Sequence, residues 1–279
     1  MKDWLQQLKA NFSWFQLFKY TVYSLLILNV FLFLNKELKA AAHRFVDGVI
    51  WSDMIDAFSS TIDTGAWVIL ILLFELETFL LSDEQLKGNI KWLLRILRSF
   101  SYVVICYAFY GYLAKYGWVM DFVSIDETTL CQHIGESWMI EADNFKTITQ
   151  ENCESLNTAP NLLKKSDLNI FTDLPQWTAS FRLALTDIFN SAAWILVVIV
   201  LEIDIWLQLK NQFKGKIYLL SKIIKGILYT VLLAAAIYWG IVGNFLEFWD
   251  AFLWIVAFIF IENNLFEWQA ETSVPTAIL

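Results

Sequence analysis

The sequence has few of the residues that most cofactor and catalytic sites require. Among its 279 residues there are 2 histidines, 3 cysteines, 3 prolines and 10 glycines. His43 and His133 lie in different segments, so no pair is spaced to hold a metal ion, and we expect neither haem nor an iron–sulfur cluster. The sequence also lacks a glycine-rich phosphate-binding loop and a nucleophile elbow. We therefore expect a protein that is not an enzyme and has no cofactor.

Charged residues are also scarce. They make up 17% of the chain, and hydrophobic residues make up 58%, whereas soluble domains average about 25% charged and about 45–50% apolar residues. The apolar excess comes in blocks, and a helix needs about 20 residues to cross a bilayer. The sequence therefore predicts an all-α, polytopic membrane protein with about six transmembrane helices, the first of them not a signal peptide. The clearest blocks are 20–34, 66–82, 99–114, 193–209, 226–246 and 245–263.

Two basic segments flank an acidic one. Segment 83–98 has four basic residues against two acids, 209–225 has five basic residues and no acid, and 118–178 has ten acids against three lysines. Because basic loops stay in the cytoplasm, we expect both basic turns and both termini inside, and 118–178 outside. The turns are short, so the lipid bilayer is an expected partner and nucleic acid is not. A bacterial inner (plasma) membrane is the expected location.

Two of the three cysteines lie in the acidic segment. Disulfides persist outside the cytoplasm, so we expect a bridge between Cys131 and Cys153. Such a bridge contributes about 3 kcal/mol, mostly by restricting the unfolded chain. Segment 118–178 then predicts a small, loop-rich extracytoplasmic cap that is too small to fold alone without its bridge. Cys106 lies in an apolar block and is expected to be inert.

Segments 66–108 and 193–235 align without a gap at an offset of 127 residues. Thirteen of the 43 aligned positions are identical, and Lys87-Gly88 aligns with Lys214-Gly215. Apolar bias alone does not align such polar positions, so we interpret the two segments as a tandem repeat. Each copy is a helical hairpin of the same orientation, which predicts a pseudo-two-fold axis along the membrane normal.

The repeat divides the chain into five parts. Two amphipathic stretches, 38–62 and 174–191, precede the copies, and we expect helices there that lie on the outer surface and bend into the membrane. The expected parts are an N-terminal cytoplasmic segment and first transmembrane helix (1–37), an amphipathic helix and first repeat copy (38–117), the cap (118–178), the second copy (179–244), and a last transmembrane helix with a cytoplasmic tail (245–279).

Both hairpins place acids opposite bases. With the first turn near Gln85–Leu86, Glu75 lies level with about Arg98, and Glu77 lies level with about Arg95. Acid opposite base is tolerated in a low dielectric, whereas acid opposite acid is costly. The corresponding levels in the second copy are Glu202 with Lys225 and Asp204 with Lys222.

These acids have two interpretations. In one, ion pairs simply stabilise each hairpin near the cytoplasmic boundary. In the other, acids line a path, because residues two positions apart on a helix point about 200° apart and cannot both face one neighbour. Glu75 and Glu202, or Glu77 and Asp204, would then approach each other at the pseudo-two-fold axis and attract cations or bind protons. A third possibility is contact with another subunit.

A second polar group lies nearer the outside in each copy. In the first copy Asp63 lies among Ser59, Ser60, Thr61 and Thr64, and in the second Asp187 lies among Thr186, Asn190 and Ser191. Hydroxyls and one carboxylate per copy would suit a hard cation or a proton relay. The simpler interpretation is helix capping where a surface helix bends into the membrane.

The leading functional hypothesis is movement of a cation or proton, by a channel or transporter that is a homo-oligomer or is associated with other membrane subunits. The competing hypothesis is a non-catalytic accessory or scaffold subunit of a larger inner-membrane complex. In the first hypothesis, four bases keep the inner acids ionised, and two outer acids form an entry site. The bases are Arg95, Arg98, Lys222 and Lys225; the inner acids are Glu75, Glu77, Glu202 and Asp204; the outer acids are Asp63 and Asp187.

Overall fold

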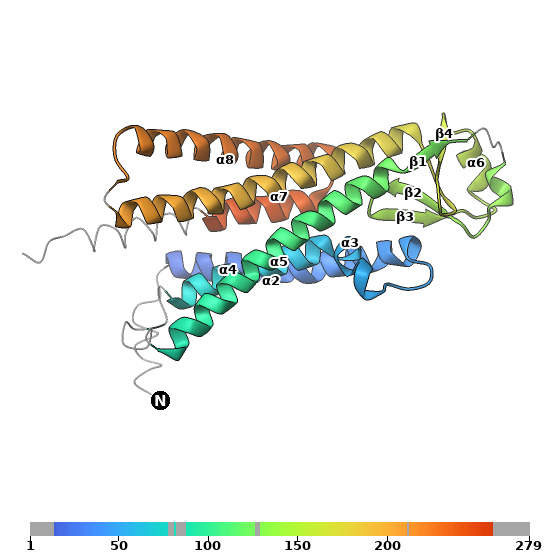
Figure 1. The fold of residues 1–279 in the computed structure, drawn as a ribbon. Helices are drawn as coiled ribbons and strands as arrows, with labels where there is room; N and C mark the ends of the chain where they lie inside the picture. The colour runs from blue at the N-terminus through green and yellow to red at the C-terminus, as the bar shows by residue number, and fades with distance from the viewer. Residues whose placement is uncertain (1–13, 78–80, 82–87, 126–128, 211, 259–279) are drawn as a thin grey trace, which may run out of the picture. The chain divides into compact units, whose positions relative to one another are not determined.

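The computed structural model describes residues 14–77, 81, 88–125, 129–210 and 212–258. They fall into two compact units, Val30–Ala235 and a smaller unit made of Met1–Asn29 with Ala236–Leu279. The larger unit contains the whole of both aligned segments and the acidic segment between them. Most of the chain is helical, and the acidic segment forms a small sheet (Figure 1).

Long apolar helices dominate both units. Four helices are long and apolar enough to cross a membrane among the described residues. The bent pair Trp51–Ala57 and Ser59–Glu75 makes a fifth if it is counted as one span. The apolar helices therefore fit a membrane protein. The predicted sixth span, about 246–263, is helical over 245–258, and the rest of it lies outside the described residues. The four long helices are α2 (Trp14–Arg44), α5 (Asn89–Met120), α7 (Leu174–Leu209) and α8 (Lys216–Val242).

A sharp break separates the short helix α3 (Met54–Ala57) from α4 (Ser59–Glu75), and the two are bent by 80°. The Glu37 carboxylate of α2 accepts hydrogen bonds from the backbone N–H of Ser60 at 2.7 Å and of Thr61 at 3.1 Å, and from the Thr61 hydroxyl at 2.6 Å. These bonds satisfy N–H groups that the first turn of a helix leaves without partners. A buried acid on one helix therefore caps the next.

The capping interpretation of Asp63 and Asp187 is wrong. Helix α4 begins after Phe58 and is capped by Glu37, so Asp63 lies one turn inside it. Asp187 lies in the interior of α7, whose N-cap is Asp173. The Asp173 side chain accepts from the Gln176 N–H at 2.8 Å, and Pro175 occupies the first turn, where no N–H is needed.

The acidic segment is a mixed five-stranded sheet, so the prediction of a loop-rich cap in an all-α chain is wrong in this part. The strand order is β1-β4-β5-β2-β3, with β2 and β5 parallel and the other pairs antiparallel. β1 begins two residues after α5 ends, and β5 leads directly into α7, so the sheet lies at the ends of these two helices (Figure 1). The strands are β1 (Phe122–Ser124), β2 (Ser137–Glu141), β3 (Asn144–Thr147), β4 (Leu162–Lys165) and β5 (Ile170–Asp173).

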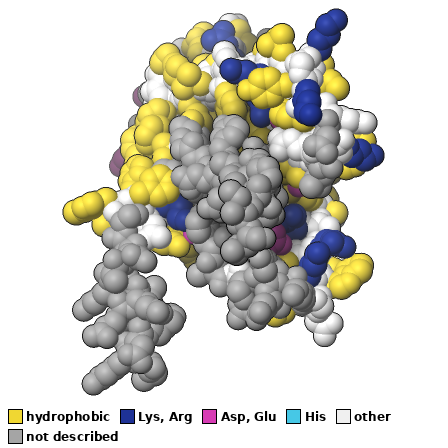
Figure 2. Space-filling model, turned by 90° about the vertical axis from the view of Figure 1, so that its left-hand side faces the viewer, with side chains coloured by type: hydrophobic (Ala, Val, Ile, Leu, Met, Phe, Trp, Pro, Cys, Tyr) yellow, Lys and Arg dark blue, Asp and Glu magenta, His cyan; other side chains and the backbone are white. Residues whose placement is uncertain are grey.

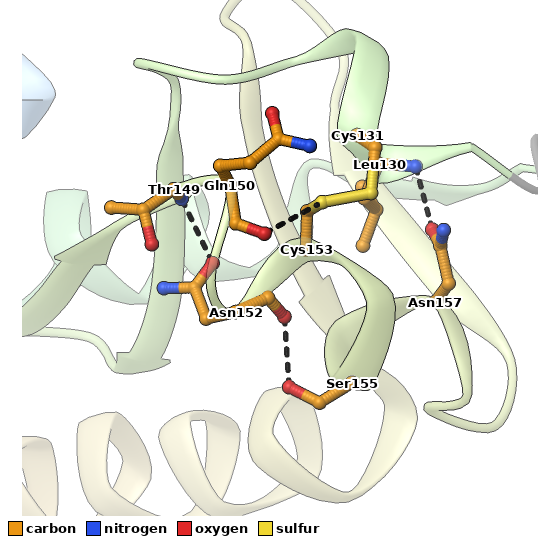
Figure 3. Close-up of a disulfide and its surroundings, with 8 residues drawn as sticks. All are labelled: Leu130, Cys131, Thr149, Gln150, Asn152, Cys153, Ser155 and Asn157. Atoms are coloured by element: carbon orange, nitrogen blue, oxygen red, sulfur yellow. Dashed lines mark hydrogen bonds between the residues drawn. A yellow bond between two sulfur atoms is a disulfide. The ribbon is translucent and has the colours of Figure 1, made fainter.

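The predicted disulfide is confirmed. Cys131 and Cys153 are bonded, with their Cα atoms 4.9 Å apart (Figure 3). The bridge joins a 3-10 turn (Leu130–Gln132) to the short helix α6 (Cys153–Asn157). Around it, the Asn157 side chain accepts from the Leu130 N–H at 2.6 Å. Cys153 is fully buried in the hydrophobic core of the cap, beside Trp138 and Phe171. The bridge therefore connects the outer edge of the cap to its core.

The smaller unit contains the first part of α2, the end of α8 and the helix over 245–258. Asn29 is buried, and its side-chain amide donates to Asp250 at 2.7 Å. This hydrogen bond joins two polar side chains that lie between apolar helices of that unit.

Candidate functional site

The inner acids of the first hairpin pair in a different register from the predicted one. The Arg98 guanidinium donates to the Glu77 carboxylate, whereas Glu77 was expected opposite Arg95. The exposed Arg95 instead lies over the ring of Trp92, 5.2 Å from its centroid. Glu75 is buried, with 3% of its surface exposed.

The second hairpin has the same register as the first. Lys225 lies 3.0 Å from the Asp204 carboxylate, and the Ser221 hydroxyl donates to the same oxygen at 2.7 Å. The predicted partner, Lys222, is exposed. Glu77 and Asp204 are aligned positions at the offset of 127, and so are Arg98 and Lys225. The same ion pair therefore occurs at aligned positions of both hairpins.

The register differs because each turn is centred further along the chain than predicted. The midpoint between Glu77 and Arg98 falls next to Gly88, and the midpoint of the other pair falls next to Gly215. These glycines have φ angles of 60° and 58°, a left-handed conformation that glycine adopts without steric cost. Each precedes the second helix of its hairpin. The glycines, and not Gln85–Leu86, therefore mark the turns.

The other acid of the second copy faces a different helix. The Tyr102 hydroxyl of α5 donates to Glu202 of α7 at 2.9 Å. Asp204 thus meets α8 and Glu202 meets α5, in agreement with the expectation that acids two positions apart cannot share a neighbour. The described partner of Glu202 is a tyrosine of the first copy and not an acid.

Basic side chains surround the end of the molecule at which α5 and α8 begin. Figure 2 views this end, and dark blue Lys and Arg side chains are spread over its described surface. Such a distribution suits a surface next to lipid headgroups. The exposed basic residues of α5, α7, α8 and the second turn are Lys91, Arg95, Lys210, Lys214, Lys216 and Lys222.

The outer acids belong to a buried ionic network that the sequence analysis did not predict. Lys115 of α5 is 5% exposed, donates to Asp187 of α7 at 3.2 Å, and forms an ion pair with Asp143 of the cap. Lys36 of α2 lies 3.8 Å from the same Asp143 oxygen. The network therefore joins two long helices and the cap through one buried ammonium group.

One signal in the sequence was available for this network. Lys115 is a single charge inside an otherwise apolar stretch of α5, and an ionisable residue in such a stretch generally has a buried partner. Asp143 lies outside the helices. Burial raises the pKa of Asp143, but the charges of Lys115 and Lys36 outweigh burial and hold this pKa below its ordinary value. Asp143 is therefore a stable anion next to Lys115.

The second outer acid, Asp63, is 8% exposed and accepts a hydrogen bond from the Tyr112 hydroxyl at 3.0 Å. Tyr112 and Lys115 are three residues apart on one face of α5. They reach Asp63 on α4 and Asp187 on α7, respectively. The structure therefore brings both predicted outer acids against the same face of α5.

An aromatic contact lies between the outer and inner acids. The rings of Trp67 on α4 and Trp194 on α7 have centroids 6.3 Å apart, and both residues are buried. From these tryptophans the two helices run through apolar residues to Glu75 and Glu202. Two polar layers are thus separated by an apolar one.

Comparison with known proteins assigns this chain to no family. No family model, curated protein or solved structure matches this chain. Within the described ranges, His, Cys, Asp and Glu form no group of three or more that could hold a metal ion. The interpretation of the two polar layers therefore rests on their geometry and charge.

Proposed function

We propose that this chain is a six-span membrane protein built on a tandem repeat, which moves protons or small cations across a bacterial inner membrane. Three features support the repeat. The same ion pair occurs at aligned positions, Glu77–Arg98 and Asp204–Lys225. Aligned glycines with positive φ mark both turns. The aligned residues Trp67 and Trp194 contact each other, as residues next to a pseudo-two-fold axis do.

The orientation follows from charge and from the disulfide. The basic turns favour the cytoplasm, and the bridged cap favours the outer side. In this arrangement both termini are cytoplasmic. Asp63 and Asp187 lie in the outer half of the membrane, and Glu75 and Asp204 lie near its inner boundary.

The observation that carries the function is the pair of polar layers on the same two helices. Helix α4 has buried Asp63 and Glu75 at the two ends of an apolar stretch, and α7 has Asp187 and Glu202 on either side of its own apolar stretch. Buried acids within spans are costly, and they mark ion or proton pathways in membrane proteins. The outer layer receives the ion, and the inner layer releases it after the apolar layer at Trp67 and Trp194 rearranges.

The inner acids differ in whether a basic side chain contacts them, and we assign them different roles accordingly. Arg98 and Lys225 form ion pairs with Glu77 and Asp204, so these two acids position the hairpins. Glu202 has a neutral partner, Tyr102, and is exposed on α7. Glu202 and its aligned counterpart Glu75 are the inner acids that we assign to binding of the transported charge.

The accessory-subunit function is the second candidate, and one observation favours it. In both hairpins an acid is neutralised by a base of the same hairpin, which stabilises a scaffold without a pathway. Large exposed side chains such as Trp92 and Trp206 would then pack against partner subunits as well as lipid. A homo-oligomer or a complex with other membrane subunits is compatible with both functions.

Flux measurements separate the two candidates. The full chain is reconstituted into liposomes, and proton or Na⁺ entry is followed with dyes trapped inside. We expect flux above that of empty liposomes, a reduction to that background in Glu75→Gln and Glu202→Gln, and no change in Glu154→Gln, an exposed acid of α6. Background flux from the wild-type protein itself would remove the transport proposal and leave the accessory function.

A further inference from the structure

The outer layer contains matching polar faces on α4 and α7. Their members recur at i, i+3, i+4 and i+7, the spacing of residues on one face of a helix. All four pairs are related by the same offset of 127 residues. The pairs are Ser60 with Asp187, Asp63 with Asn190, Thr64 with Ser191, and Trp67 with Trp194.

Helix α5 joins the two faces. Its Tyr112 hydroxyl bonds Asp63, and its Lys115 ammonium group bonds Asp187. On one side the region ends at the contact of Trp67 with Trp194. On the other side it ends at the ion pair of Lys115 with Asp143 of the cap. Helix α5 therefore contributes one polar contact to each of the two faces.

Ser191 has an unusual environment for a helical serine. Ser180 on the same helix and Ser101 on α5 donate to backbone carbonyls of their own helices, at 2.9 Å and 3.0 Å. The Ser191 hydroxyl is buried, with 2% of the residue exposed, and has no hydrogen-bond partner among the described residues. The side-chain carbonyl of Asn190 has none there either. A buried polar atom without a partner is costly, and a bound ion or water is one of its ordinary explanations.

The charges of this region favour one added positive charge. Lys115 compensates Asp187 and Asp143, with Lys36 close to the latter. The donors to Asp63 are the Tyr112 hydroxyl and the Trp67 indole, which are both neutral, and no basic side chain forms a salt bridge with Asp63 in the described ranges. Asp63 is thus a buried carboxylate whose partners do not neutralise it.

We propose that Asp63, Thr64, Asn190 and Ser191, beside Tyr112, form a binding site for a small monovalent cation such as Na⁺. The donors are one carboxylate, hydroxyls and an amide carbonyl, all of them hard oxygen ligands. A divalent ion generally takes more carboxylates, and a proton does not require several neutral oxygens. The site rests on the proposed function and deepens it, because it names the ion that occupies the outer layer.

Equilibrium binding tests the site without any transport step. The thermal unfolding midpoint of the full chain in detergent is measured as NaCl replaces choline chloride at constant ionic strength. We expect Na⁺ to raise the wild-type midpoint by about 5 °C when its concentration is about tenfold above its Kd. Asp63→Asn loses this rise, and Ser191→Ala needs about tenfold more Na⁺ for the same rise. Ser180→Ala is the matched control and titrates like the wild-type protein, because its hydroxyl bonds its own helix.

Two results overturn the proposal. One is a wild-type unfolding midpoint that Na⁺ leaves unchanged. The other is a Ser191→Ala variant whose midpoint depends on Na⁺ concentration in the same way as that of Ser180→Ala. If Ser191→Ala does not yield folded protein, Thr64→Val replaces it, and the same tenfold shift is required. Na⁺ binding without flux in liposomes would refute the transport proposal alone. Flux without a Na⁺-dependent midpoint would refute the cation site alone.

Discussion

The indole rings of Trp67 and Trp194 lie 6.3 Å apart, although these residues are separated by the offset that aligns the two hairpins. In the proposed repeat, these are equivalent residues, and a contact between equivalent residues occurs next to the axis that relates the two copies. The side chains on either side of this contact are therefore expected to be energetically linked across the two halves of the chain.

The first prediction concerns this contact. Trp67→Leu and Trp194→Leu should each lower the free energy of unfolding, and the double variant should lose less than the sum of the two by about 0.5–1.5 kcal/mol, because the second substitution removes no further ring contact. Reversible unfolding in mixed micelles measures all four proteins. Strict additivity would show that the rings do not interact in the folded protein.

The second prediction concerns the register of the hairpins. Arg98→Gln and Lys225→Gln should destabilise the protein by about 1 kcal/mol or more, because each leaves a carboxylate without its base. Arg95→Gln and Lys222→Gln, which change the neighbouring exposed bases, should have effects within about 0.5 kcal/mol. Thermal unfolding midpoints compare the two pairs. A larger destabilisation in Arg95→Gln and Lys222→Gln than in Arg98→Gln and Lys225→Gln would support the register expected from a turn at Gln85–Leu86.

The third prediction concerns Lys115. Lys115→Met removes the only described base that contacts both Asp143 and Asp187, and it should cost about 3–5 kcal/mol because both carboxylates stay buried. Adding Asp143→Asn and Asp187→Asn to Lys115→Met should restore part of the loss, since the two acids that faced Lys115 are then neutral. Unfolding midpoints of the single and triple variants provide the comparison. A triple variant with a lower unfolding midpoint than Lys115→Met alone would contradict this explanation.

The fourth prediction concerns acid. The pKa of Asp143 is lower in the folded protein than its ordinary value of 3.8. Its ion pair therefore stabilises the fold fully above that ordinary value, and this stability is lost as the pH falls through the folded value. We expect the wild-type midpoint to fall between about pH 4 and pH 2. The unfolding midpoint of Asp143→Asn, measured over the same pH range, should fall less steeply than that of the wild-type protein. If the two midpoints fell in parallel with pH, Asp143 would make no contribution.

The sequence predicts best the features that repeat. Thirteen identities between two segments indicated the hairpins, and acids and bases at aligned positions indicated ion pairs in both. Ion pairs do occur in both hairpins. The short basic turns do not show at which residue each hairpin turns, so the paired residues differ from those expected. Cys131 and Cys153 were predictable because they are the only cysteines in a polar segment, and the structure joins them.

The cap and the outer network were not predictable in the same way. The five strands have three to five residues each, and β5 is buried at all four positions, so no alternation of polar and apolar residues marks them. The contact of Lys115 with Asp143 joins residues from a long helix and a strand connection, 28 positions apart. Its two members follow no local spacing, and only the folded cap brings them together.

Asp173 is both the last residue of β5 and the N-cap of α7, so no linker separates the sheet from that helix. At 1.5 Å per residue, the 36 residues of α7 form a rod about 54 Å long. A small tilt of the sheet would therefore be amplified at the far end of the rod, beside Asp204. A force applied to the cap would therefore act near Asp204 with the leverage of that length.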